Sequence, residues 1–270
     1  MILYDGHLHT LFCPHGTKDP LEAYCERALE LGLKGITFTE HAPLPSSFID
    51  PVPNQDSAMA KADLYPYLNE VKRVKKKYKS LLSIKVGLEV DFIEGYEEET
   101  KFFLNEVGPE LDDSILSVHF LKHQNEYICI DYSPEHFERM VRSLGTVELV
   151  HDHYYETIKK SIITDLGRYK PKRIGHITLT QKFKQKFQAQ TYPLSEKVSE
   201  LFPLIKEEKM SLDLNGAGTL KPLCQETYPP LPIIEIAFKE GIPLVYGSDA
   251  HQVKAMMAGK EVIPTTMLST

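Results

Sequence analysis

The sequence predicts an α/β fold in which βα units repeat around a parallel sheet. Short runs rich in apolar and β-branched residues alternate with longer charged segments, in which apolar residues recur at three- and four-residue steps. The chain has 270 residues, of which 42% are hydrophobic, enough for one sizeable core. No linker-like composition marks a boundary, so we expect a single domain over residues 1–270.

Seven apolar runs are expected to form the strands. They are Ile2–Tyr4, Gly35–Thr39, Ser83–Glu89, Ser114–His119, Arg173–His176, Ser211–Asn215 and Pro243–Ser248. The segments of helical period between them are Pro20–Leu31, Lys61–Lys79, Glu97–Val107, Pro134–Leu144, Ser195–Lys209 and Leu231–Glu240. The longest step between strands, from His119 to Arg173, has further helical periodicity around Val147–Asp165. We interpret it as a helical excursion, about residues 145–170, inserted into the same domain.

Two other segments allow more than one interpretation. Ala42–Ala58 holds four prolines and no periodicity, which predicts a stiff loop that is either a lid or a long connection. The basic run Lys72–Lys79 resembles a nucleic acid patch in composition. A solvated helix face is favoured, because the acidic run Glu94–Glu99 follows it closely.

Composition excludes several classes of protein. A net charge of −7 argues against a protein that mainly grips nucleic acid phosphates. The four cysteines, at positions 13, 25, 129 and 224, form no C-x-x-C pair, so neither a disulfide framework nor a thiolate zinc site is indicated. The opening apolar run MILY is too short for a signal peptide, and no 18-residue apolar stretch follows. We expect a cytoplasmic protein with no membrane partner.

Histidines and carboxylates follow the predicted strands at their carboxyl ends. In a parallel βα barrel these ends meet at one mouth, where active sites are built. Imidazoles and carboxylates gathered there are suitable ligands for divalent zinc, iron or manganese. Buried structural histidines are the alternative, but five strand ends and a final D-x-H favour a metal cluster. The residues concerned are His7, His9, Glu40, His41, Glu89, Asp91, His119, His176, Asp249 and His251.

A set of motifs over nearly the whole chain resembles the polymerase and histidinol phosphatase (PHP) superfamily, in its histidinol-phosphatase branch. The motifs are DGHLHT at 5–10, FCPHG at 12–16, ITFTEHAPLP at 36–45, GLEVDF at 87–92, LDDSILSVHF at 111–120, RIGHI at 173–177 and GSDAH at 247–251. This resemblance implies a distorted (β/α)7 TIM-like barrel with three divalent metal ions (Zn, Fe or Mn) at the carboxyl ends of its strands.

The resemblance also implies how the ligands divide among the ions. The first ion would be held by His7, His9, Glu89 and Asp249, and Glu89 would bridge to a second ion held by His119 and His176. The third would be held by His15, His41 and His251. His15 lies in a loop, so only the resemblance supplies it.

The implied reaction is hydrolysis of the phosphomonoester L-histidinol phosphate to L-histidinol and phosphate, a late step of histidine biosynthesis. Glu89, Asp249 and His251 are the candidate catalytic residues, and either the third ion or a water linked to Asp249 and His251 would serve the leaving alkoxide. The sequence leaves the oligomeric state open.

Substrate contacts are inferred from charge. Leu220 stands where related phosphatases have an arginine, so Lys221 or Arg173 is expected to contact the phosphate. Asp91, Glu94 or Glu40 would receive the substrate's ammonium group.

Two other functions are considered. A PHP-type nuclease would need the same metals, but the acidic net charge and the phosphatase-like motifs disfavour it. A catalytically silent metal-binding protein is disfavoured by the nine filled ligand positions. The remaining histidines, His123, His136, His151 and His153, are expected to lie on surfaces or helix faces, although His151 or His153 would reach the mouth in the alternative interpretation.

Overall fold

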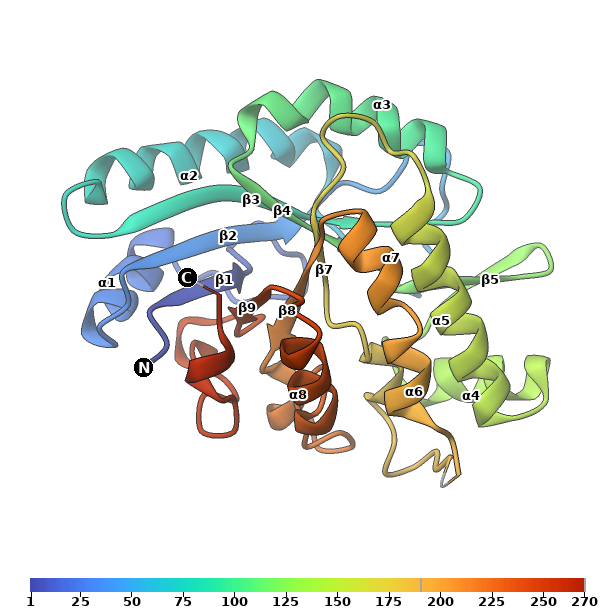
Figure 1. Ribbon diagram of the computed structural model, residues 1–270. Coiled ribbons are helices and arrows are strands. Elements are labelled where there is room, and N and C mark those ends of the chain that lie inside the picture. The colour runs from blue at the N-terminus through green and yellow to red at the C-terminus, as the bar shows by residue number, and fades with distance from the viewer. Residues whose placement is uncertain (190, 270) are drawn as a thin grey trace.

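Seven parallel strands form a nearly closed barrel in the computed structural model, which describes residues 1–189 and 191–269 (Figure 1). Neighbouring strands pair in the order β1, β2, β3, β4, β7, β8 and β9. The barrel closes where Leu8 bridges Ala250 and where Asp249 N donates to His7 O at 2.8 Å. The predicted seven-stranded barrel is therefore confirmed. Its strands are β1 (Tyr4–Leu8), β2 (Gly35–His41), β3 (Ser83–Asp91), β4 (Asp113–Ser117), β7 (Arg173–Ile174), β8 (Ser211–Asn215) and β9 (Leu244–Gly247).

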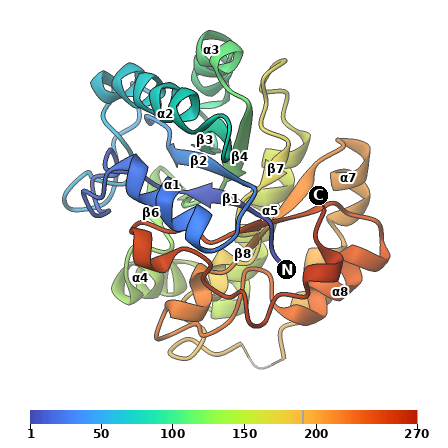
Figure 2. The same cartoon turned by 90° about the vertical axis from the view of Figure 1, so that its left-hand side faces the viewer.

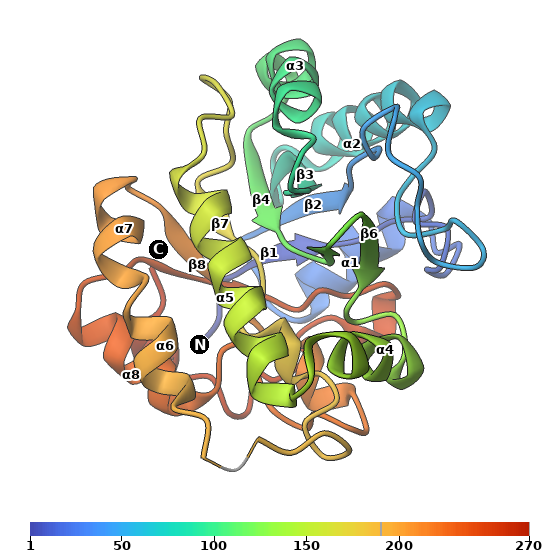
Figure 3. The ribbon, with the colours of Figure 1, turned by 90° about the vertical axis from the view of Figure 1, so that its right-hand side faces the viewer.

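Helices surround the barrel, as Figures 2 and 3 show from opposite sides. Among the described residues, none of them combines the length and the apolar character needed to cross a membrane. The predicted excursion contains the long helix α5, which packs against α4 and α7. The helices are α1 (Leu21–Glu30), α2 (Leu64–Tyr78), α3 (Glu97–Val107), α4 (Pro134–Leu144), α5 (Val147–Ile163), α6 (Leu194–Ser199), α7 (Phe202–Glu207) and α8 (Leu231–Lys239).

The basic run lies on α2, whose apolar side is buried through residues such as Tyr67 and Val71. Its cations pair with acidic groups of neighbouring elements: Lys72 with Glu110, Lys75 with Asp112, and Arg73 with Glu22 at 2.6 Å. The interpretation of this run as a solvated helix face is confirmed.

The fourth predicted strand and one predicted helix differ from the structure. The fourth strand ends at Ser117, and the chain then forms an antiparallel hairpin of β5 (Phe120–His123) and β6 (Glu126–Cys129). In Figure 1 the arrowhead of β2 points toward the side of the molecule that carries this hairpin. The single helix expected over Ser195–Lys209 is divided into α6 and α7. Pro203 lies in the first turn of α7, where its missing N–H is tolerated.

The proline-rich loop after β2 is packed against the body of the protein. Phe48 and Val52 are buried in a cluster with Ile93, Phe120 and Cys129, so the loop is held to the β5–β6 hairpin. Within the loop, the Asp50 carboxylate accepts hydrogen bonds from Val52 N and Ser57 N at 3.0 Å each. Its role as a lid stays a prediction.

Candidate metal centre

Glu89, near the end of β3, lies at the centre of the site. Its Oε2 is 3.3 Å from His7 Nε2 and 3.4 Å from His9 Nε2. The same oxygen is 3.2 Å from His41 Nδ1, whereas Oε1 is 2.8 Å from His176 Nε2. The two oxygens of one carboxylate therefore face two different groups of imidazoles, as a bridging ligand requires.

The first two proposed ligand groups are assembled around this carboxylate. His7, His9 and Glu89 offer ligand atoms within 4.8 Å of one another, and so do Glu89, His119 and His176. Asp249 joins the first group, because its Oδ1 is 3.1 Å from His9 Nε2. These placements agree with the division of ligands that the resemblance implies.

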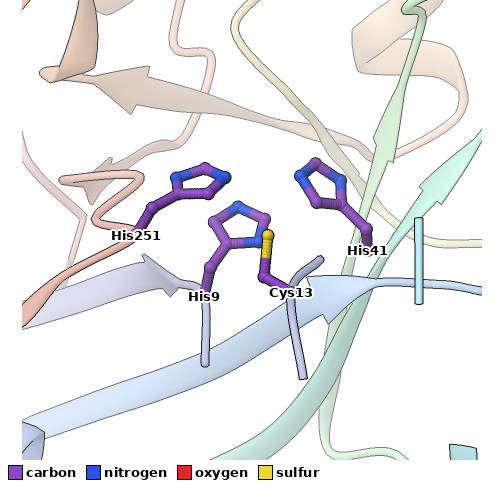
Figure 4. Close-up of side chains that lie close together, drawn as sticks. All are labelled: His9, Cys13, His41 and His251. Carbon is purple, nitrogen blue, oxygen red and sulfur yellow. The ribbon is translucent and has the colours of Figure 1, made fainter. Parts of the chain in front are cut away.

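The third group differs in detail from the expected one. The rings of His9, His41 and His251 converge with the sulfur of Cys13 (Figure 4), and their ligand atoms lie within 4.8 Å of one another. His15 lies beside this group, with its Nε2 3.2 Å from His251 Nε2. All nine predicted ligand residues are thus brought together. Cys13 was missed, because its buried position in the FCPHG loop has no periodic signal in the sequence.

The backbone is strained at two of the ligands. His176 and Asp249 have positive φ angles of 22° and 52°, which are uncommon outside glycine. Such strain concentrates at functional sites, where the surrounding structure enforces it. The neighbouring Gly175 is needed for space, because a Cβ there would lie 2.1 Å from Ser117 Oγ. That hydroxyl donates to Glu89 Oε1 at 2.6 Å, so the close approach helps to orient the central carboxylate.

Three further carboxylates orient ligand histidines from outside. Asp213 Oδ2 lies 2.8 Å from His7 Nδ1. A carboxylate on the second ring nitrogen fixes the tautomer and orientation of a metal-binding histidine. Asp213 was missed, although its alternation in SLDLN at 211–215 places it on the inward face of β8.

The other two outer carboxylates are Glu40 and Asp91. Glu40 Oε1 is 3.1 Å from His9 Nδ1, and Asp91 Oδ1 is 2.7 Å from His119 Nδ1. Both had been candidates for the substrate's ammonium group, but each is engaged with a ligand histidine. The third candidate, Glu94, pairs with Lys160.

Burial and neighbouring charges shift the pKa values of several groups in the site. Burial would raise the pKa of Glu89, but the imidazole of His7 and a hydrogen bond from His176 hold that pKa well below its ordinary value. Burial, reinforced by the neighbouring His9, keeps the pKa values of His41 and His251 well below the ordinary value. Both rings are therefore neutral, which is the form that binds metal.

Unsatisfied ring nitrogens point to the same conclusion. His9 Nε2 and His41 Nδ1, which both face Glu89 or its neighbours in the ligand groups, are buried without a hydrogen-bond partner among the described residues. A buried polar atom normally has such a partner, so these nitrogens indicate an absent group. The donor set of imidazoles and carboxylates suits zinc, iron or manganese.

Seven of the nine ligands, all except His7 and His9, line a cavity of about 510 Å³, a volume within the range of small-molecule sites. Lys221, which was predicted, and Lys182, which was not, line this cavity together with Leu220. Arg173 does not line it. Its buried guanidinium lies inside the barrel, where it donates to Gly6 O at 2.9 Å and to Asp113 at 3.0 Å. The prediction that Arg173 contacts the phosphate is therefore wrong.

The other histidines lie outside the cavity lining. His151 Nδ1 is 2.8 Å from Thr180 Oγ1. His153 Nε2 lies 2.7 Å from Lys122 O. His136 packs on its own helix cap at Ser133, and His123 contacts the ring of His153. The helix-face interpretation of His151 and His153 is confirmed over the alternative at the barrel mouth.

Comparison with known proteins places this site in a family. The family model described as the PHP domain matches residues 5–217. The chain belongs to the PHP domain family. It is 49% identical over 252 residues to the histidinol-phosphatase of Bacillus subtilis, with 92% of this chain and 93% of that protein covered. Asp249 and His251 lie beyond the matched residues, so their assignment rests on the geometry above.

Two solved structures share the fold. A protein from Listeria monocytogenes assigned as the histidinol phosphatase hisK is 42% identical, with a TM-score of 0.92 over 97% of this chain and 100% of that chain. Histidinol phosphate phosphatase (HISK) from Lactococcus lactis, solved with zinc, L-histidinol and phosphate, is 19% identical. Its TM-score is 0.68 over 96% of this chain and 92% of that chain, a likeness of fold.

Proposed function

We propose that this PHP family member is a histidinol-phosphatase, which hydrolyses L-histidinol phosphate to L-histidinol and inorganic phosphate in histidine biosynthesis. One observation carries the proposal: nine imidazole and carboxylate ligands are brought together, seven of them in the lining of one cavity, with Glu89 between two of the groups. The 49% identity to the Bacillus subtilis histidinol-phosphatase supports the choice of substrate.

The centre is proposed to hold three divalent ions, in the groups described above. Bound there, such ions would neutralise phosphate charge and lower the pKa of a bound water toward neutrality, so that hydroxide is available for in-line attack. Zinc is the ion present in the Lactococcus lactis structure. Iron and manganese suit the same donor atoms.

The chain's own residues orient the reacting groups. Ser117 and His176 both hydrogen-bond Glu89 Oε1, at 2.6 Å and 2.8 Å, and so fix the plane of the central carboxylate. Lys182 and Lys221 provide positive charge in the cavity wall for the phosphate oxygens. With Leu220 at the position of the family arginine, two lysines supply that charge without the planar, two-pronged donor geometry of a guanidinium.

The leaving alkoxide needs a proton to become the alcohol product. Asp249 and His251 both line the cavity, and His251 Nδ1 is 3.5 Å from Asp249 Oδ1. A water held between these side chains and the ester oxygen would deliver the proton to the alkoxide. Both residues therefore serve as positioning groups for proton transfer as well as metal ligands.

A panel of substrates tests the function. Purified chain with known metal content is assayed for phosphate release from L-histidinol phosphate, from 4-nitrophenyl phosphate and from a phosphodiester of single-stranded DNA. We expect the highest kcat/KM with L-histidinol phosphate. Preferential cleavage of the DNA would indicate the nuclease function instead, and full metal content without hydrolysis of any ester would indicate a silent metal-binding protein.

A further inference from the structure

A partly buried ion pair in the cavity wall is unexplained by metal binding. Lys182 Nζ donates to Asp131 Oδ2 at 2.8 Å, and each side chain is 20% exposed. Both residues line the cavity. Burial would raise the pKa of Asp131, but the charges of Lys182 and His119 hold it well below its ordinary value, so the carboxylate is ionised.

The pair lies beside the second ligand group. Ile130 N donates to His119 O at 3.0 Å, which closes the base of the β5–β6 hairpin and places Asp131 next to that ligand. Lys182 follows a short 3-10 turn (Leu179–Gln181) that begins three residues after His176, with Leu179 N donating to His176 O at 2.8 Å. A negative and a positive side chain are thus held together at the edge of the metal centre.

Asp56 also lines the cavity, from the proline-rich loop, but the remaining carboxylates of the lining contact ligand histidines. Glu89 and Asp249 contact the ligand histidines, and Asp91 accepts from His119. Asp131 accepts a weak thiol hydrogen bond from Cys129 at 3.3 Å, and its main partner is the flexible ammonium of Lys182. One cation can replace another at such a carboxylate without leaving a buried charge unpaired.

We propose that Asp131 binds the ammonium group of the substrate, while Lys182 turns toward the phosphate. This inference rests on the proposed function, because L-histidinol phosphate carries an amine on the carbon next to the one that bears the phosphate ester. Its positive and negative groups then match Asp131 and Lys182 respectively. The pair selects aminoalkyl phosphates over phosphomonoesters that lack an amine.

The test compares two esters that differ only in the amine. Wild type and Asp131→Asn are assayed with L-histidinol phosphate and with 3-(imidazol-4-yl)propyl phosphate, its desamino analogue. A hydrogen bond between charged groups predicts a loss of about 10- to 100-fold in kcat/KM for L-histidinol phosphate in the variant. For the desamino ester we expect a change of no more than about threefold. Equal losses with both esters would overturn the proposal, since Asp131 would then act only by holding Lys182.

Control variants separate the contribution of Asp131 from that of Lys182. Lys182→Gln is expected to lower kcat/KM for both esters alike. Asp152→Asn disrupts another Asp–Lys pair, with Lys197 at 3.2 Å outside the cavity lining, and is expected to leave both values unchanged. If Asp56→Asn loses the preference for L-histidinol phosphate over the desamino ester and Asp131→Asn keeps it, the ammonium contact lies in the proline-rich loop. That result would overturn the assignment to Asp131.

The unmodified chain gives a second measurement that does not depend on folding of a variant. L-Histidinol should inhibit hydrolysis of 4-nitrophenyl phosphate about tenfold more strongly than its desamino analogue, 3-(imidazol-4-yl)propanol. Equal inhibition, with L-histidinol phosphate still a good substrate, would overturn the ammonium site and leave the proposed function standing. Failure of wild type to hydrolyse L-histidinol phosphate would overturn both.

Discussion

At the scale of single residues, the carboxylates behind the ligand histidines are as important as the ligands they hold. Asp213, Glu40 and Asp91 each accept from one ring nitrogen, which leaves the opposite nitrogen of that ring free for metal. The buried environment makes such a contact strong and its loss costly.

Asp213→Asn tests this arrangement at His7. The amide keeps the shape of the side chain but removes the charge that fixes the ring, so metal affinity should fall by about 10- to 100-fold. Competition with a chelator, followed by metal analysis, measures the change. Asp165→Asn, an exposed aspartate that pairs with Lys101, is the control and should bind metal like wild type. Unchanged affinity in Asp213→Asn would show that the outer carboxylate is dispensable.

The sequence could predict the metal ligands better than the residues that surround them. His41 ends β2 and Glu89 lies two residues before the end of β3. The β-propensity of both strands is plain, so a barrel model brings the two residues together. Arg173 was misplaced because a position three residues before His176 lies inside the barrel, at the amino end of β7. Asp131 and Lys182 come from a hairpin and a turn whose positions depend on tertiary packing, so only the structure reveals their contact.

At the scale of elements, the loop after β2 links the hairpin to the third ligand group. The Phe48 ring lies 5.1 Å from that of Phe120 and 5.2 Å from that of Tyr96 in edge-on contacts. Further along the loop, Asp56 O lies 2.9 Å from His15 Nδ1. Packing of one aromatic ring thus supports the position of a metal ligand.

Phe48→Ala should loosen this loop. The substitution creates a cavity in the small aromatic cluster, and we expect faster proteolytic cleavage within residues 42–58 and a lower occupancy of one metal ion. Limited proteolysis and metal analysis are the measurements. Ile49→Ala is the matched control, because the neighbouring Ile49 side chain is 77% exposed. If both variants behave like wild type, the loop is not held by Phe48.

Polar residues at the site also explain which elements were hard to predict. The first strand was expected over Ile2–Tyr4 but spans Tyr4–Leu8, because the sequence DGHLH at 5–9 reads as polar. These residues are buried, and His7 and His9 belong to the first ligand group. The hairpin was missed because its turn, at Gln124 and Asn125, has no glycine, although Gln124 adopts a φ of 55°.

At the scale of the whole molecule, α5 joins the barrel to its outer helices. Tyr154 donates to His176 O at 3.4 Å, and His151 contacts Thr180 at 2.8 Å. The helix thereby supports the segment that carries both His176 and Lys182. Burial lowers the pKa of His151 from 6.5 to about 4, so the ring is neutral in the folded protein near neutral pH.

The lowered pKa of His151 makes the free energy of unfolding depend on pH. Between pH 6.5 and 4 the unfolded chain binds a proton at His151 that the folded chain does not, so acidification through that window favours unfolding. The contribution amounts to at most about 3 kcal/mol. His151→Gln should lose less unfolding free energy than wild type between pH 7 and 4.5, measured by denaturant titration of metal-free protein. Parallel losses in both proteins would contradict this account.

The most direct test of the metal centre is Glu89→Ala. This substitution removes the carboxylate shared by two ligand groups, so purified variant should lose at least two metal ions per chain relative to wild type. Hydrolysis of L-histidinol phosphate should fall by about a thousandfold or more. Glu106→Ala, an exposed glutamate on α3, should retain both properties. Full metal content with near-normal turnover in Glu89→Ala would contradict the central claim.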